Sequence, residues 1–250
     1  MTQDANIFDA IDAGDLSAIK ALVGAGADLE ERGKGRATPL LRACAKGQTE
    51  IVSALIDAGA DVNSVEFMGR TPLMVAAAEG NLGAMRALIA AGADVNTEDK
   101  LGMLTPLSCA AGHGQVEAMK ELIAAGADLG HQNFRGLNAI FVAAAMGQVE
   151  ALKHLEQAGL DPKEPAQDGT TTLMVAAECG RMDMLDYLVK TGLDPRSHDR
   201  GGLTAIERAR RGGKPEAAAW LERKVIDKEV EEAMSSRRQL TAPFARARSL

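Results

Sequence analysis

Residues 71–80 read TPLMVAAAEG, and similar stretches recur along the 250-residue chain. The copies begin at intervals of 33, 34, 33, 33 and 33 residues, at Thr38, Thr71, Thr105, Asn138, Thr171 and Thr204. Self-similarity at this period indicates one helical unit that is copied and stacked, so that each copy packs against its neighbours. The pattern therefore predicts a repeat fold, and it favours binding over catalysis.

Each copy contains start and stop signals for two helices. Thr71 is placed to cap a first helix, Pro72 occupies its first position, and Gly80 is placed to end it in a left-handed conformation. A second helix is indicated by apolar residues at helical spacing, Leu82, Met85, Leu88 and Ile89. A turn-rich connection, GADVN at residues 92–96, then leads to the next copy.

This unit resembles the ankyrin repeat. The TPL opening, the alanine pair, the mid-unit glycine and the GADVN endings at 59–63 and 92–96 match that family, and the resemblance covers about residues 5–224 as seven units. It implies an all-α ankyrin-repeat solenoid of about seven helix-turn-helix units. Antiparallel helix pairs are expected to stack in a curved array, with a β-turn loop, here called a finger, projecting before each first helix.

The chain is predicted to divide into four segments. An N-terminal capping repeat is expected over 1–35, five internal repeats over 36–201, and a C-terminal capping repeat with a helical extension over 202–234. Residues 235–250 hold four arginines and no acid, so they are predicted to be a flexible basic tail.

Two departures from the family pattern carry expectations. The histidine that usually follows TPL is absent, so apolar packing is expected to replace its hydrogen bond; the positions hold Leu41, Met74, Ser108, Phe141, Met174 and Glu207. The segments 35–37 and 102–104 each place one extra residue between the finger glycine and the capping threonine. Two bulged fingers are therefore predicted.

Charge and hydropathy exclude several classes of partner. The formal net charge of −7 argues against a nucleic-acid partner, which would call for a basic face. No apolar stretch approaches the ~18 residues of a membrane helix. The N-terminus has no signal-peptide pattern. We expect a cytoplasmic protein with no membrane association.

The repeat register also keeps reactive residues apart. Two units separate Cys44 from Cys109 and Cys109 from Cys179, which places each pair about 20 Å apart, too far for a disulfide. The finger histidines His131 and His198 are equally distant, whereas metal ligands must converge on one ion. No glycine-rich phosphate loop is present. We expect no metal, no cofactor and no enzymatic activity.

The resemblance implies that a partner binds at the fingers and on the concave face of the first helices. The central fingers carry large apolar residues, and cations flank them, a composition typical of binding hot spots; the residues are Phe67, Met68, Leu101, Met103 and Phe134 with Arg70, Lys100 and Arg135. The alternative is that some of them, Met103 above all, pack beneath the fingers. On the first helices the candidates are Glu79, His113 and Met146, beside a floor of small residues.

The expected function is therefore that of a monomeric, non-enzymatic module that binds another protein or peptide. The mixed finger charges predict a modest preference for a partner with acidic segments. Two alternatives stay open. One is an inhibitor or immunity-type protein that occludes a partner enzyme. The other is a homo-oligomeric module that associates through residues 225–250, whose apolar positions otherwise dock on the last repeat.

Overall fold

The computed structural model describes residues 6–246, except the side chains of residue 231 and of residues 235–246. The chain divides into two compact units, Met1–Pro162 and Lys163–Leu250, and the predicted block 36–201 extends into both. Throughout the described part the regular elements are helices, with a single isolated bridge between His198 and Thr204. The helix pairs follow one another at the predicted interval, so the all-α solenoid is confirmed.

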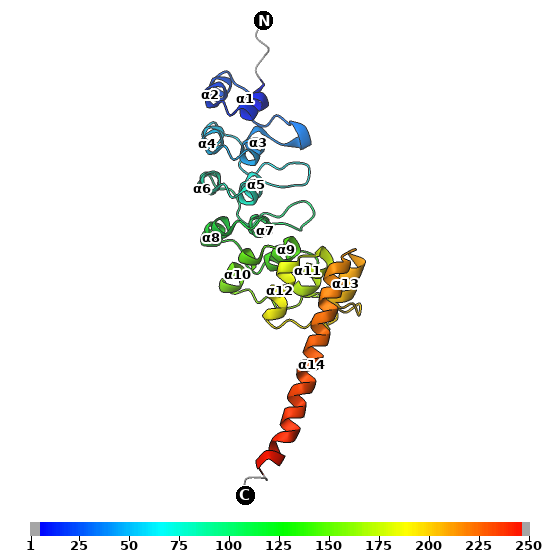
Figure 1. Cartoon of the computed structure of the whole chain (residues 1–250). Helices are drawn as coiled ribbons and strands as arrows, with labels where there is room; N and C mark the ends of the chain where they lie inside the picture. The colour runs from blue at the N-terminus through cyan, green and yellow to red at the C-terminus, as the bar shows by residue number, and fades with distance from the viewer. Residues whose placement is uncertain (1–5, 247–250) are drawn as a thin grey trace. The chain divides into compact units, whose positions relative to one another are not determined.

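The first unit consists of helix pairs stacked in register. Figure 1 shows α2, α4, α6 and α8 in one column and α1, α3, α5 and α7 in a second column, with the fingers beyond the second. The first helices of the pairs are α1 (Ile7–Ala13), α3 (Pro39–Ala45), α5 (Pro72–Glu79), α7 (Pro106–Gly112) and α9 (Ala139–Met146). The second helices are α2 (Leu16–Gly24), α4 (Thr49–Asp57), α6 (Leu82–Ala90), α8 (Val116–Ala124) and α10 (Val149–Gln157).

The predicted caps form. The Thr71 hydroxyl accepts a hydrogen bond from the Met74 amide at 3.3 Å, and Gly80, at φ 68°, donates its amide to the carbonyls of Ala76 and Ala77. Both bonds satisfy backbone groups that a helix end leaves without partners. Threonine and glycine at this spacing therefore fix the length of the first helix.

The core is built from small and branched residues between successive first helices. The TPL leucine and the alanine pair of the third repeat, Leu73, Ala76 and Ala77, are fully buried. Alanine at these positions lets α5 lie close to α3 and α7. At the family's histidine position, apolar packing holds for Leu41, Met74, Phe141 and Met174, which are all buried.

Three residues at that position keep a hydrogen bond: Met174, whose sulfur accepts from the Thr171 amide at 3.4 Å, and the two polar residues, Ser108 and Glu207. Ser108 Oγ accepts from the Thr105 amide at 2.8 Å, and Glu207 Oε2 accepts from the Thr204 amide at 2.7 Å. Each side chain closes a capping box with its threonine. The expectation of apolar packing is therefore wrong at Ser108 and Glu207, because the oxygen of each side chain accepts a hydrogen bond from the backbone N–H of the capping threonine.

One finger is bulged, not two. The backbone bond that closes each finger joins residues four apart, as in Gly33 N–H to Ala37 O and Glu66 N–H to Arg70 O, but five apart in Asp99 N–H to Leu104 O. The first finger (33–37) has the ordinary length, and it contains the 3-10 turn η1 (Lys34–Arg36). The first finger differs from the second in its residue type at one position: Arg36 has φ 62°, where the second finger has Gly69 at φ 84°.

The second unit contains α11 (Thr172–Cys179), α12 (Met182–Lys190), α13 (Ala205–Arg211) and α14 (Pro215–Arg246). A network of charged groups closes it: the Arg208 guanidinium, largely buried, binds the carboxylates of Asp199 and, at 3.2 Å, Glu178. Leu221 is fully buried where α14 packs on α13. Two ion pairs hold the next turns of α14, Lys228 with Asp194 at 3.1 Å and Arg196 with Glu232 at 3.5 Å.

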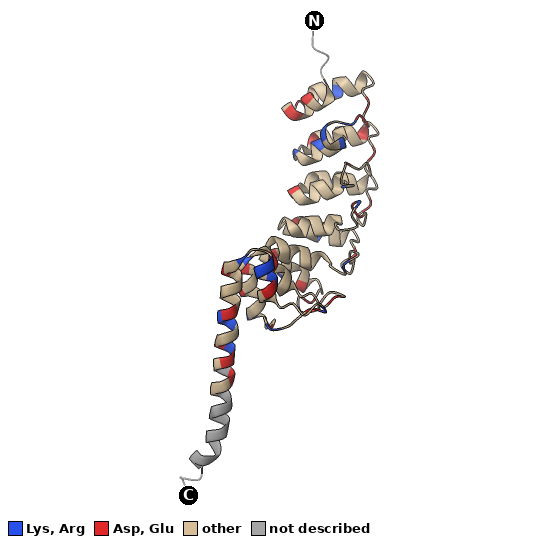
Figure 2. Ribbon diagram, turned by 90° about the vertical axis from the view of Figure 1, so that its right-hand side faces the viewer, with Lys and Arg blue, Asp and Glu red and all other residues tan. Residues whose placement is uncertain are grey.

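Helix α14 continues past the predicted end of the capping repeat at residue 234 and ends at Arg246. Residues 235–246 are therefore helical where the sequence predicts a flexible tail, and residues 247–250 lie outside the described part. Once a helix is nucleated, each further residue costs little to add, so the docked turns of α14 favour its extension. The ribbon of α14 in Figure 2 carries both acidic and basic segments over its coloured part, whereas α5 and α6 are mostly uncharged.

Candidate partner-binding surface

The fingers of the central repeats are held by their own first residues. Glu66 Oε1 accepts from the Met68 amide at 3.0 Å, Asp99 Oδ1 from the Met103 amide at 2.7 Å, and Asn133 Oδ1 from the Arg135 amide at 2.9 Å. Each bond closes a tight turn of the type that acidic and amide side chains favour. Because these polar groups face inward, the remaining finger side chains are left to face solvent.

Four predicted apolar residues are exposed. The exposed fraction is 63% for Phe67, 57% for Leu101 and 75% for Phe134, and Met68 is exposed at 42%. Large apolar side chains that gather on neighbouring loops are a feature of interaction sites, whereas single exposed ones are common. The sequence predicts these positions well, because no finger residue is needed for the core.

The fifth apolar candidate differs. Met103 is only half-buried, and its sulfur lies 3.7 Å from Asn133 Nδ2 of the following finger. The extra residue of the bulged finger (99–104) places Met103 against its neighbour. Met103 therefore belongs to the local packing of the fingers more than to their exposed face.

The three predicted cations are exposed but differ in their partners. Arg70 Nε lies 3.2 Å from Glu66 Oε1, and Lys100 Nζ donates to the Phe67 carbonyl at 3.3 Å. Arg135 makes no ion pair within the described part of the chain. Burial alone raises the pKa of Glu66, but hydrogen bonds from the Met68 amide and from Arg70 bring that pKa below its ordinary value.

Backbone bonds join the first three fingers to one another. The Phe67 amide donates to the Gly35 carbonyl at 3.0 Å, and the Lys100 amide donates to the Met68 carbonyl at 3.1 Å. We call the exposed residues of the second to fourth fingers the finger patch: Phe67, Met68, Arg70, Lys100, Leu101, Phe134 and Arg135.

The remaining candidates lie at the ends of the first helices. Glu79 is exposed at the end of α5, and Met146 at the end of α9. His113 is exposed after α7, and its Nδ1 lies 2.9 Å from the Cys109 carbonyl. A side chain on Gly112, at the end of α7, would press on Val142 and touch Met146, so glycine there makes room for Val142 of α9. In the described part of the first unit, no hydrogen bond or ion pair joins these three residues to the finger patch.

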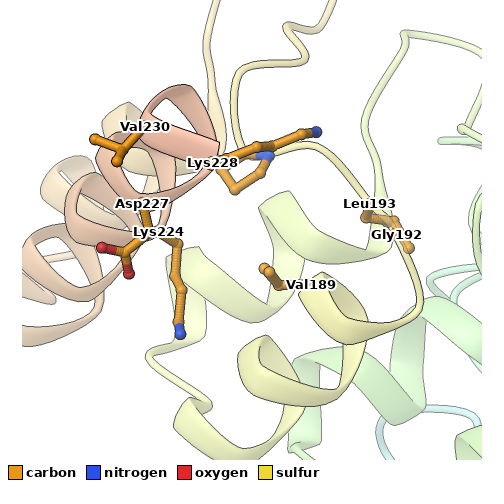
Figure 3. Close-up of a pocket in the computed structure, with 8 residues that line it drawn as sticks. Val189, Gly192, Leu193, Lys224, Asp227, Lys228 and Val230 are labelled. Carbon is orange, nitrogen blue, oxygen red and sulfur yellow. The ribbon is translucent and has the colours of Figure 1, made fainter. Parts of the chain in front are cut away.

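The sequence did not predict two hollows. A pocket of about 270 Å³ lies between α1 and the first finger, where Phe8, Asp12, Lys34 and Arg42 line it. Figure 3 shows a larger one of about 590 Å³ in the second unit, between α14 and the loop after α12, with Lys224, Asp227, Lys228 and Val230 on one side and Val189, Gly192 and Leu193 on the other. A lysine pair at i, i+4 was the only signal for it in the sequence.

The thiols are not placed for chemistry. Cys44 and Cys109 are buried, and burial raises the pKa of each to about 12, so neither provides a thiolate near neutral pH. Among the described side chains, no three His, Cys, Asp or Glu residues converge as a metal site would need. None of the described helices combines the length and the apolar character needed to cross a membrane.

Comparison with known proteins agrees with this architecture. Models of ankyrin repeats match residues 7–99 as three copies, and further models of many copies match residues 107–155 and 157–209. The search of curated proteins found no match. The crystal structure of the human ASB11 ankyrin repeat domain resembles this chain with a TM-score of 0.70 and 24% identity, covering 87% of this chain and 97% of that domain. At that identity the likeness concerns the fold alone. Successive family matches along the chain, the repeat period and the stacked helix pairs together show that this chain belongs to the ankyrin-repeat family.

Proposed function

We propose that this chain binds another protein or peptide through the finger patch and the neighbouring first-helix ends of its central repeats. The observation that carries the proposal is the exposure of Phe67, Leu101 and Phe134 on fingers that hydrogen bonds hold in place. Rigid loops that present large apolar groups lose little conformational entropy on binding. Ankyrin repeats are generally protein–protein interaction modules and not catalysts, which supports this assignment.

The charge around the finger patch favours a partner with acidic segments. The carboxylates of Glu66 and Asp99 accept hydrogen bonds within their own fingers. Lys100 and Arg135, in contrast, form no ion pair with an acidic residue of the described chain. Cations at the edge of an apolar patch raise the rate of encounter with acidic surfaces. The three unpaired cysteines fit a reducing compartment, so we propose that binding takes place in the cytoplasm.

The proposal is tested by truncating two exposed rings together. Phe67→Ala combined with Phe134→Ala should weaken partner binding by more than about 2 kcal/mol, roughly 30-fold, while the melting temperature stays nearly unchanged. Partners are captured from a cell lysate on wild-type and variant protein, and the affinity of a recovered partner is measured by calorimetry. As a control, Glu117→Ala with Lys120→Ala removes an exposed ion pair of α8, outside the patch and outside α14.

The outcomes separate clearly. A partner that is lost by the finger variant and kept by the control supports the finger patch as the binding surface. A large fall in melting temperature for the finger variant would show that the rings belong to the core. Recovery of the same proteins by all three samples would refute the assignment of binding to the fingers.

A second candidate function has one observation in its favour. Ile226, Val230 and Met234 follow one another at i, i+4 and i+8 on α14, and all three are exposed. An apolar stripe on a helix is usually covered, so we also propose self-association through α14. Sedimentation equilibrium of the wild type beside an Ile226→Glu/Val230→Glu variant tests it, since both substitutions leave the ion pairs of Lys228 and Glu232 intact. A monomeric wild type at all concentrations would rule it out.

A further inference from the structure

Within each unit, neighbouring fingers are linked by backbone hydrogen bonds between equivalent positions, here called the ladder. The amide of the second residue of a finger donates to the carbonyl of the third residue of the finger before it. This holds for Phe67 to Gly35 at 3.0 Å, for Lys100 to Met68 at 3.1 Å, and in the second unit for Arg200 to Asp168 at 2.8 Å. A bond from Phe134 to Leu101 would continue the series, and the described residues do not form it.

The extra residue of the third finger explains the break. That finger closes from Asp99 to Leu104, five residues apart, whereas the fourth closes from Asn133 to Leu137, four apart. The added residue changes the path of the third finger, and its edge no longer meets the fourth. In place of the backbone bond, Asn133 Nδ2 lies 3.7 Å from the Met103 sulfur, and just before the two fingers His131 Nε2 lies 3.6 Å from Glu98 Oε1.

The break leaves backbone groups open on both sides. The amides of Leu101 and Phe134 make no hydrogen bond within the described chain, and the Leu101 carbonyl accepts none. The same two residues carry two of the most exposed apolar side chains of the first unit, Phe134 at 75% and Leu101 at 57%. Two free backbone amides, one free carbonyl and two exposed apolar side chains therefore lie at the junction of the third and fourth fingers. The other finger junctions of the first unit are closed by a backbone hydrogen bond.

The exposed charges at this junction are two cations and one acid, Glu98, whose carboxylate lies 3.6 Å from His131 Nε2 and close to Gly102. Asp99, the acid nearest in sequence, is buried and accepts from the amides of Met103 and Leu104. The exposed cations beside the break are Lys100 and Arg135, and neither is paired with a carboxylate of the described chain, whereas Glu98 lies near His131. An occupant with a carboxylate would find a cation on either finger.

We propose that the break between the third and fourth fingers receives an extended segment of a partner protein, with a large apolar side chain beside an aspartate or glutamate. Its backbone carbonyl accepts from the Phe134 amide, and its own amide donates to the Leu101 carbonyl, so that the segment completes the ladder. The apolar side chain lies between Leu101 and Phe134, and the acid pairs with Arg135 or Lys100. This inference depends on the proposed function, because it names the class of segment that the finger patch binds.

Deletion of Met103 provides a matched variant. It changes the finger from DKLGMLT to DKLGLT, the same length and ending as residues 199–204, DRGGLT. We expect the shortened finger to bond to Phe134 as the other fingers bond to theirs. Hydrogen exchange at the Phe134 amide should be fast in the wild type and slowed in the variant, and the urea midpoint should be equal or higher.

The binding experiment uses a phage-displayed library of random dodecapeptides, selected on the full-length wild type. Enriched sequences should share a large apolar residue next to an acid. Synthetic copies should bind the Met103 deletion, Phe134→Ala and Arg135→Glu at least tenfold more weakly, and they should slow exchange at the Phe134 amide of the wild type. If the deletion variant does not fold, Phe134→Ala and Leu101→Ser, both at exposed positions, decide the result.

Three outcomes oppose the inference. Peptides that bind the deletion variant and the wild type equally would place the site elsewhere and leave the proposed function standing. Enriched peptides without aspartate or glutamate would show that Lys100 and Arg135 do not select the partner, and the proposed class of apolar and acidic segment would be wrong. A selection that enriches no common sequence would overturn the inference, and the lysate capture would then decide the proposed function by itself.

Discussion

Replacing Gly69 by alanine should destabilise the first unit more than the same change at Gly92. The two glycines have nearly the same conformation, φ 84° and φ 87°. Their surroundings differ: a side chain on Gly69 would overlap the backbone nitrogen of Lys100, whereas one on Gly92 would meet nothing within 4 Å. Each substitution forces alanine into the left-handed region, which costs about 1 kcal/mol or more.

The additional loss at Gly69 comes from the finger ladder. Relief of the overlap has to move Lys100 away, which breaks the bond from its amide to the Met68 carbonyl. A backbone hydrogen bond contributes about 1 kcal/mol, so we expect Gly69→Ala to lower the free energy of unfolding by about 2 to 3 kcal/mol. Gly92→Ala should lower it by about 1 kcal/mol.

Urea unfolding followed by far-ultraviolet circular dichroism measures the difference, and hydrogen exchange at the Lys100 amide locates it. Repeat arrays unfold as a sum of units and interfaces, so the lost free energy should be accompanied by faster exchange at Lys100 alone among the finger amides. Equal destabilisation by the two substitutions, with Lys100 still protected, would refute the claim that the ladder contributes to stability.

Three further predictions concern packing, thiols and acid. Ala77→Leu should lower the free energy of unfolding by roughly 1–3 kcal/mol by overpacking a fully buried position, and an unchanged urea midpoint would refute the packing described. Iodoacetamide at pH 8 should modify Cys179 first, because burial raises the pKa of Cys44 to about 12, and peptide mass spectrometry gives the order. A backbone amide and the Arg208 guanidinium lower the pKa of Asp199, so its carboxylate stabilises the second unit near neutral pH and loses this effect as the pH falls below the ordinary value of 3.8. Asp199→Asn should therefore lower stability at pH 7 and flatten its decline in acid, whereas a parallel decline for both proteins would contradict the assignment.

The sequence predicted the helices because their ends are decided locally. Thr71, Pro72 and Gly80 each act on backbone groups a few residues away, so their spacing is sufficient evidence for a helix of that length. The exposure of Phe67 and Phe134 followed from the same register, because a finger residue has no place in a core made by the helices.

What the sequence missed depends on contacts between repeats. Two bulges were predicted because two fingers place an extra residue between a glycine and the threonine. The length of a finger is instead set by the backbone bond that starts at its first residue, and this bond shows one long finger. In the first finger Arg36 takes the left-handed φ that a glycine takes in the others. The inward position of Met103 and the open amide of Phe134 likewise depend on the path of the neighbouring finger. Helix α14 was underestimated because its continuation depends on the turns already docked on α13.

The division of labour within a finger explains why binding and stability can be separated here. The residue that begins each central finger turns its oxygen inward to the backbone; Asp99 and Asn133 are buried in doing so, and Glu66 is half-buried. The next residues face outward and contribute nothing to the core, as with Phe134. A change at the outward positions therefore alters what the finger patch binds, whereas a change at the inward positions alters whether the patch exists. The length of the third finger is the exception, because its extra residue both packs against Asn133 and opens the ladder. Removing that residue should close the junction and leave the urea midpoint equal or higher while it weakens binding at least tenfold, a combination that loss of a merely structural residue does not produce.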